Sequence, residues 1–166
     1  MVLLFQICVG RNSMKIRTFE KQDLAQCLKL ARKQYMESNW SHIPYHEAYV
    51  KNYYLNSLGN PRYLVLVAEH ENKIVGASAV ALQNYNFSYD VFVQDIFFYL
   101  EPAHRKGMTA KTFYDRVYRW GAEKGALEVY LNYGFGKENA RIEKFYNRMG
   151  YKHFSDNYKR EIVNGW

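Results

Sequence analysis

Three consecutive strand-like runs stand in the middle of this chain, with helical patterns on both sides of them. Residues 63–69, 74–82 and 92–100 are rich in apolar, β-branched and aromatic side chains, and a turn-like break at residues 71–73 separates the first two runs. These two runs predict a β-hairpin. A sheet built from clustered strands has to be covered by helices, so the chain is restricted to a mixed α/β domain.

Helical periodicity supplies the covering elements. Apolar residues such as Leu24 and Leu28 recur at helical spacing over residues 22–37, and a second helix is predicted over residues 45–58. Residues 109–124 predict a third helix that turns one apolar side inward, with Gly125 as its stop.

The remaining elements follow the same reasoning. A first strand is expected at residues 15–19 and a later one at 127–131, then a helix over 138–149 and a last strand at 151–154, with residues 158–163 as a strand that could pair beside it. The predicted fold is therefore a central mixed β-sheet flanked by helices.

Length and composition fit a single globular domain. The chain has 166 residues, and 48% of them are hydrophobic, which is enough to bury one core but not two. We expect residues 14–166 to form this domain. Residues 1–13 form either an upstream extension or a short extra strand, and they lack the basic start and cleavage site of a signal peptide.

The charge and the cysteines restrict the partners. A formal net charge of +7 attracts phosphorylated ligands, nucleic acid or acidic protein without choosing among them. Cys8 and Cys27 form no disulfide or metal pattern, which favours a reducing, cytoplasmic setting. The five histidines are scattered without ligand spacing, so no metal is expected, and no apolar run is long enough to cross a membrane.

Residues 102–110 read P-A-H-R-K-G-M-T-A and lead from the third strand of the central group into the helix over 109–124. A strand that ends at a helix N-terminus exposes unpaired N–H groups, and these groups bind anions such as a pyrophosphate. Small residues let the backbone approach the phosphates. The alternative interpretation is a strand-to-helix turn that binds no ligand, in which Gly107 only allows the backbone to turn.

This segment resembles the acetyl-CoA-binding segment of the GNAT N-acetyltransferase family, P-x-x-R/Q-x-x-G-x-G/A. Residues 139–151 resemble the second signature of that family, N-x-x-A-x-x-F-Y-x-x-x-G-F. The likeness covers residues 14 to 155, and the aromatic-rich loops also resemble GNAT-like proteins encoded by bacteriophages. Met108 stands where the family usually has its first glycine; a register that uses Gly107 instead breaks the match to Pro102.

The resemblance implies acetyl-CoA as cosubstrate and a set of residues that bind it: Leu100, Arg105, Lys106, Gly107, Met108, Thr109, Ala110 and Asn139. It also implies Tyr146 as the general acid that protonates the leaving thiolate, although the chain has 16 tyrosines and this one could serve packing instead. Asp95, on the strand before the loop, is the candidate base.

The implied activity is direct transfer of an acetyl group to an unidentified amine. Trp40, His42, Tyr45 and the loop of residues 84–89 are candidate walls for the acceptor. The net charge keeps a second enzyme class open, namely GNAT-like modification of a DNA base or a charged tRNA. A third alternative is a binding protein that keeps the fold without catalysis. Either a monomer or a homodimer fits the sequence.

Overall fold

The computed structural model describes residues 14–105, 108–132 and 140–155, which fall into two compact units, residues 1–136 and 137–166. The first unit holds a five-stranded sheet in the order β1-β2-β3-β4-β5. Its strands are β1 (Lys15–Thr18), β2 (Tyr63–His70), β3 (Lys73–Asn84), β4 (Val91–Leu100) and β5 (Val129–Tyr130). The first four strands are antiparallel, and β5 runs parallel to β4.

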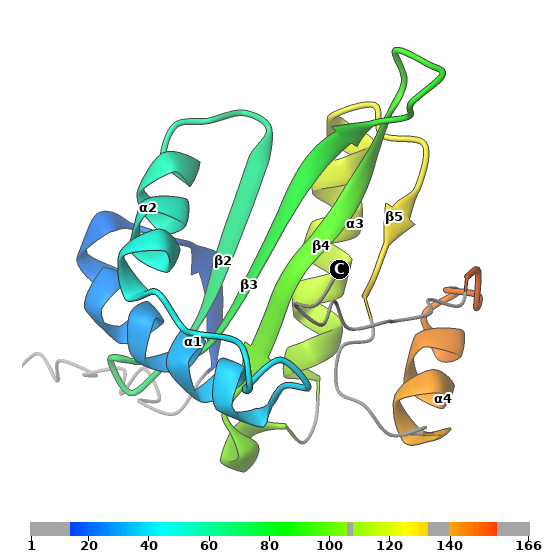
Figure 1. Ribbon diagram of the computed structural model, residues 1–166. Coiled ribbons are helices and arrows are strands. Elements are labelled where there is room, and N and C mark those ends of the chain that lie inside the picture. Colours follow the sequence, from blue (N-terminus) through cyan, green and yellow to red (C-terminus); the bar gives the residue numbers. More distant parts are fainter. Residues whose placement is uncertain (1–13, 106–107, 133–139, 156–166) are drawn as a thin grey trace, which may run out of the picture. The chain divides into compact units, whose positions relative to one another are not determined.

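Helices cover both faces of this sheet (Figure 1). On one face lie α1 (Leu24–Glu37) and α2 (Glu47–Ser57), and on the other lies α3 (Thr109–Glu123). Two short 3-10 turns, η1 (Lys21–Asp23) and η2 (Pro102–His104), precede α1 and follow β4. The predicted mixed sheet flanked by helices is confirmed.

The core has two layers because the strands are buried on both faces. One cluster packs under α1 and α2 around the fully buried Tyr54 and Val67. The other packs under α3, where Phe113 and Val117 occupy the predicted inward side of the helix. Alternate residues of β2 and β3 serve the two clusters, as the two-residue period of a strand requires.

Close packing holds α3 against β4. A Cβ atom on Gly121 would lie 2.8 Å from Cγ2 of the buried Val93, so only glycine permits this approach. The helix is thereby fixed next to the strand that leads into it. Figure 1 shows α3 running along β4 and β5 on the far side of the sheet from α1.

Several element boundaries match the sequence predictions and two do not. The β2–β3 turn has Glu71 and Asn72 at positive φ, which confirms the hairpin. In contrast, β5 is only two residues long, and residues 151–155 form no strand, so the strand predicted at 151–154 is wrong. Apolar composition predicted both strands, but a strand requires a partner within reach of its backbone groups.

The second unit contains α4 (Ala140–Arg148), which confirms the described part of the helix predicted over residues 138–149. Residues 1–13, the predicted strand at 158–163 and the site candidates Lys106, Gly107 and Asn139 lie outside the described residues. Within the described ranges, no helix has the length and apolar character needed to cross a membrane.

Candidate functional site

A β-bulge interrupts β4 beside the candidate base. Val80 of β3 pairs with Asp95, but the preceding residue Ala79 pairs with Phe97, so Ile96 has no partner in β3. Bulges re-aim side chains and leave backbone groups outside the ladder, and they occur frequently next to active sites. The irregularity therefore lies next to a carboxyl group in the middle of the sheet.

Asp95 is buried, with 6% of its surface exposed. Burial raises the pKa of Asp95 to about 7, against a smaller lowering by the backbone of Asn132. No cation of the described residues contributes to this pKa. A carboxyl group with this pKa can accept and release a proton near neutral pH, whereas an ordinary aspartate is almost fully ionised there.

The sheet opens between β4 and β5 at the same level. β5 pairs only with Val93 and Gln94, although β4 continues to Leu100. At Asp95 the ladder is replaced by a side chain, because the Asn132 amide donates a 2.8 Å hydrogen bond to the Asp95 carbonyl oxygen. From Ile96 onward, no described strand pairs with β4 on the side of β5.

The open edge of β4 leads into the strand-to-helix turn. Met108 is the N-cap residue of α3, with its side chain 64% exposed, and the described side chains provide no capping hydrogen bond there. The first turn of α3 contains no acidic residue. No carboxylate of this first turn therefore competes for its N–H groups, and these groups together with the helix dipole favour an anion.

The Arg105 side chain, at the start of the turn, is directed back toward the sheet. Its Nε donates a 2.7 Å hydrogen bond to the Leu100 carbonyl oxygen, and its Nη2 donates a 2.6 Å hydrogen bond to Glu37. The guanidinium carbon lies 5.3 Å from the centre of the Tyr99 ring. The side chain thus connects the end of β4 with the end of α1.

Tyr146 lies in α4, which belongs to the second unit. Its ring centre is 5.9 Å from that of Phe145 and 6.0 Å from that of Tyr151. The Tyr151 amide donates to the Tyr146 carbonyl oxygen, which closes the helix end ahead of the positive-φ Gly150. The predicted signature N-x-x-A-x-x-F-Y-x-x-x-G-F thus includes a helix and its C-terminal stop.

The segment between α1 and α2 contains three of the predicted acceptor walls, Trp40, His42 and Tyr45, whereas the loop of residues 84–89 joins β3 to β4. Tyr35 fixes this segment, because its hydroxyl lies 2.7 Å from the Ser41 carbonyl oxygen and 2.6 Å from that of Ile43. The rings of Tyr45 and Tyr35 pack together, and the guanidinium carbon of Arg32 lies 4.7 Å from the centre of the Tyr45 ring. Trp40 remains 50% exposed. The segment is therefore an ordered surface with apolar side chains directed outward.

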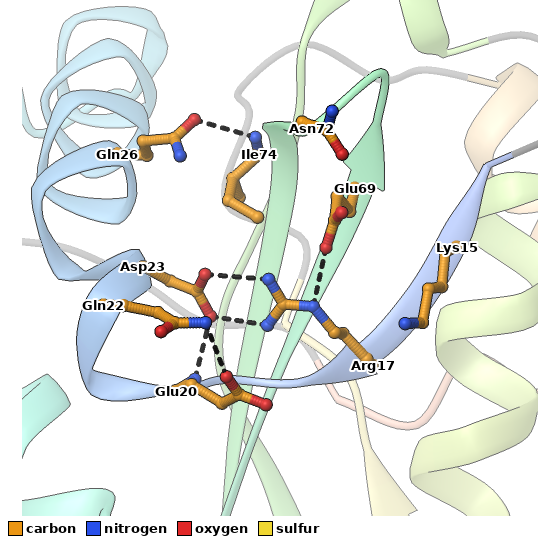
Figure 2. Close-up of a pocket in the computed structure, with 9 residues that line it drawn as sticks. All are labelled: Lys15, Arg17, Glu20, Gln22, Asp23, Gln26, Glu69, Asn72 and Ile74. Atoms are coloured by element: carbon orange, nitrogen blue, oxygen red, sulfur yellow. Dashed lines mark hydrogen bonds and ion pairs between the residues drawn. The ribbon is translucent and has the colours of Figure 1, made fainter. Parts of the chain in front are cut away.

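A polar pocket lies elsewhere on the first unit, between β1, β2 and the start of α1 (Figure 2). Arg17 occupies its centre, with Nη1 2.6 Å from one Asp23 oxygen and Nε 2.7 Å from a Glu69 oxygen. These opposite charges satisfy one another. We therefore interpret this pocket as an ion-pair network that joins three elements, and not as a ligand site.

Sequence reasoning missed two residues of the site, Glu37 and Asn132. Glu37 reaches Arg105 across 68 residues, and Asn132 reaches Asp95 across 37. Neither residue belongs to a motif or has a local signal that marks it. Only the pairing of β4 with β5, and the packing of α1 against the end of β4, bring these side chains to the site.

Comparison with known proteins is consistent with this geometry. The model of the Acetyltransferase (GNAT) family matches residues 24–151. An uncharacterized N-acetyltransferase of Mycobacterium bovis is 30% identical over 95 residues, which are 57% of this chain and 56% of that protein. A protein of the same description from Mycobacterium tuberculosis matches equally well. This chain therefore aligns with only about half the length of these relatives.

Solved structures share the fold. The aminoglycoside acetyltransferase AAC(6')-Iy, in complex with the bisubstrate analogue CoA-S-monomethyl-acetylneamine, superposes with a TM-score of 0.70 at 21% identity, over 91% of this chain and 99% of that one. An acetyltransferase from Clostridium acetobutylicum with acetyl-CoA gives 0.72 at 17% identity, over 90% and 96%. The family match extends over more than half of the sequence, and this chain therefore belongs to the GNAT acetyltransferase family.

Proposed function

We propose that this protein transfers the acetyl group of acetyl-CoA directly to an amine. The observation that carries the proposal is the arrangement along β4. A buried carboxyl group with a pKa of about 7 lies on β4, beside a bulge and an edge without a described partner strand. The strand leads to a helix N-terminus that receives no capping hydrogen bond from the described side chains. Family membership and solved relatives with CoA or acetyl-CoA support the same reading.

The cosubstrate fits the turn after β4. In this proposal the backbone from Arg105 to Ala110 binds the CoA pyrophosphate, with Lys106, Gly107, Met108 and Thr109 between them. The absence of acidic residues from the first turn of α3 supports it, because a carboxylate there would repel the phosphates. Leu100, at the end of β4, is a proposed contact of the pantetheine arm, and Asn139 of the second signature is a further proposed cofactor-binding residue.

Asp95 is the proposed general base. An amine is mostly protonated at neutral pH and must lose a proton before its nitrogen attacks the thioester carbonyl carbon. Asp95 takes this proton directly or through a water molecule. Its pKa of about 7 supports the role, because a base with a pKa near the working pH is the most effective one.

Tyr146 is the proposed general acid. When the C–S bond breaks, the sulfur receives the bonding electron pair, and the phenol of Tyr146 donates a proton to it. The acetyl carbon stays bonded to the nitrogen, which releases its extra proton, and a proton returns to the phenolate of Tyr146. The products are an acetylated amine and free CoA. The position of Tyr146 in the second family signature supports this assignment.

The acceptor is an amine that reaches the face of the sheet beside the segment between α1 and α2. Neamine is a suitable first candidate, because a solved relative with this fold binds a bisubstrate analogue containing acetylneamine. Polynucleotide acceptors form the second class to be tested, because the chain has a net charge of +7.

The proposal is tested by thiol release from acetyl-CoA with a panel of amines, together with the intact mass of each acceptor. Tyr146→Phe removes only a hydroxyl group, so CoA affinity should remain within about twofold while kcat falls by roughly 10²-fold or more. Phe145→Tyr is a matched control, because it changes the neighbouring ring of the same helix.

Wild-type turnover in Tyr146→Phe would refute the assignment of the acid. A wild-type protein that binds CoA but acetylates no amine in the panel, and no polynucleotide, would instead favour a binding protein on the same fold.

A further inference from the structure

The end of α1 is joined to the end of β4 by a cluster of three side chains, Glu37, Tyr99 and Arg105. One carboxylate oxygen of Glu37 accepts a 2.8 Å hydrogen bond from the Tyr99 hydroxyl. The other accepts a 2.6 Å hydrogen bond from Arg105. Each oxygen of Glu37 thus has its own donor, and the two donors lie 62 and 68 residues away along the chain.

We propose that Glu37 is a positioning residue for cosubstrate binding, which acts by holding Arg105 against the end of β4. This inference rests on the proposed function, because it concerns the same CoA site. Glu37 itself touches no cosubstrate in this proposal. Its effect passes through Arg105, the last described residue before the turn into α3.

The geometry of Arg105 supports a positioning role. The Nε–H group donates a 2.7 Å hydrogen bond to the carbonyl oxygen of Leu100, five positions earlier in the chain, and this hydrogen bond is partly buried. The guanidinium group stacks over Tyr99, and Glu37 fixes its other end. Planar guanidinium groups lose little entropy when several donors are engaged at once, so the three contacts together restrict the turn.

The charge of Glu37 suits this task. Burial alone would raise the pKa of Glu37, but hydrogen bonds from Arg105 and Tyr99 lower it below the ordinary value. The carboxylate is therefore ionised at neutral pH and attracts the guanidinium group of Arg105. A glutamine could accept one hydrogen bond at the same place but would not supply the charge.

A competing interpretation predicts the opposite effect. If Arg105 bound the CoA phosphates through its guanidinium group, Glu37 would compete with them for the same donors. Removal of the carboxylate would then tighten CoA binding. The positioning role predicts weaker binding, because the turn loses a support that exists before the ligand arrives.

The test is calorimetric titration of CoA into the full chain and into Glu37→Gln, Arg105→Gln and the double variant. Each single variant should weaken CoA binding by about three- to tenfold, the size expected for a partly exposed charged contact. The double variant should be no weaker than Arg105→Gln, because the two residues act as one unit. In thiol-release kinetics, Glu37→Gln should raise KM for acetyl-CoA and leave kcat unchanged.

Glu101→Gln is the matched control. Glu101 pairs with Lys33 and so also joins α1 to the end of β4, but no hydrogen bond or ion pair joins the described side chains of Glu101 and Arg105. Its CoA affinity should stay within about twofold of wild type. Tyr99→Phe removes the hydroxyl group that holds Glu37 and should give a smaller loss of the same kind, which keeps the test decisive if Glu37→Gln fails to fold.

The outcomes separate this inference from the proposed function. Equal or tighter CoA binding by Glu37→Gln, or a double variant whose losses add, would overturn the positioning role while the proposed function stood. Equal losses in Glu37→Gln and Glu101→Gln would overturn it also, because general attachment of α1 would explain both. A wild-type protein without CoA affinity would overturn both proposals.

Discussion

At the scale of single residues, Asp95 shows how burial in a strand changes the pKa of a carboxyl group. An aspartate on a strand is costly to bury, because its charged form loses hydration. The fold buries it beside the bulge at Ile96 and raises its pKa to about 7. The protonated form is therefore favoured by folding, and the ionised form is disfavoured.

This pKa predicts how stability depends on pH. The pKa of Asp95 in the folded state lies above its unfolded value. The contribution of protonated Asp95 to the unfolding free energy is therefore fully present below about pH 4 and is lost as the pH rises to about 7. Asp95→Asn remains neutral throughout. Compared with wild type, it should gain on the order of 2–4 kcal/mol in unfolding free energy between pH 4 and pH 8.

Denaturant titrations of both proteins at the two pH values measure this gain. A difference that does not change with pH would contradict the raised pKa. Under the proposed function, Asp95→Asn should also lower kcat by about 10²-fold or more, which thiol release would record.

At the scale of elements, the network around Arg17 joins β1, β2 and η1. The Asp23 side chain is only 4% exposed and depends on Arg17 for its compensating charge. Burial alone would raise the pKa of Asp23, but the hydrogen bond from Arg17 lowers it below the ordinary value. Its contribution to stability is therefore present above the unfolded pKa and is lost as the pH falls through the folded one.

Arg17→Met should consequently lower the unfolding free energy by about 3 kcal/mol at pH 7, because it leaves a buried carboxylate without a partner. The loss should shrink as the pH falls through the lowered folded-state pKa of Asp23, because the protonated carboxyl group no longer needs the charge of Arg17. Lys15→Met is the control, since it removes the same charge from the same strand. Thermal and denaturant unfolding measure both variants, and equal losses in the two would show that the network contributes nothing specific.

At the scale of the whole molecule, the positive net charge and the N-terminal dipole of α3 both favour an anionic ligand. The two features differ in specificity. The net charge attracts any polyanion, and salt screens this attraction. Backbone N–H groups at the N-terminus of α3 have a fixed geometry and therefore select a ligand that fits them. Binding measured in different salt concentrations therefore distinguishes them.

CoA and acetyl-CoA should raise the melting temperature, because they bind only the folded chain. At about 100 times Kd the gain is about 2.7 kcal/mol, which corresponds to roughly 5–10 °C for a domain of this size. Nicotinamide dinucleotides should give no shift. Differential scanning fluorimetry with CoA, NAD and duplex DNA across a salt series measures this, and a shift with DNA alone would point to the nucleic-acid class.

The sequence by itself determined the order of strands and helices. Local signals carried this information: the turn at Glu71 and Asn72, the periodicity of α1 and α3, and the positive-φ stop at Gly125. Each of these signals acts within a few residues, where backbone sterics and side-chain spacing suffice. The motif at residues 102–110 likewise marked the turn into α3 without knowledge of the fold.

Only the tertiary structure decided the length of β5, the bulge at Ile96, the pKa of Asp95 and the contact between Glu37 and Arg105. The reason is physical. Strand pairing requires a partner chain segment, and desolvation depends on every group packed around a side chain. An ion pair that spans 68 residues is specified by packing, and no local pattern encodes it.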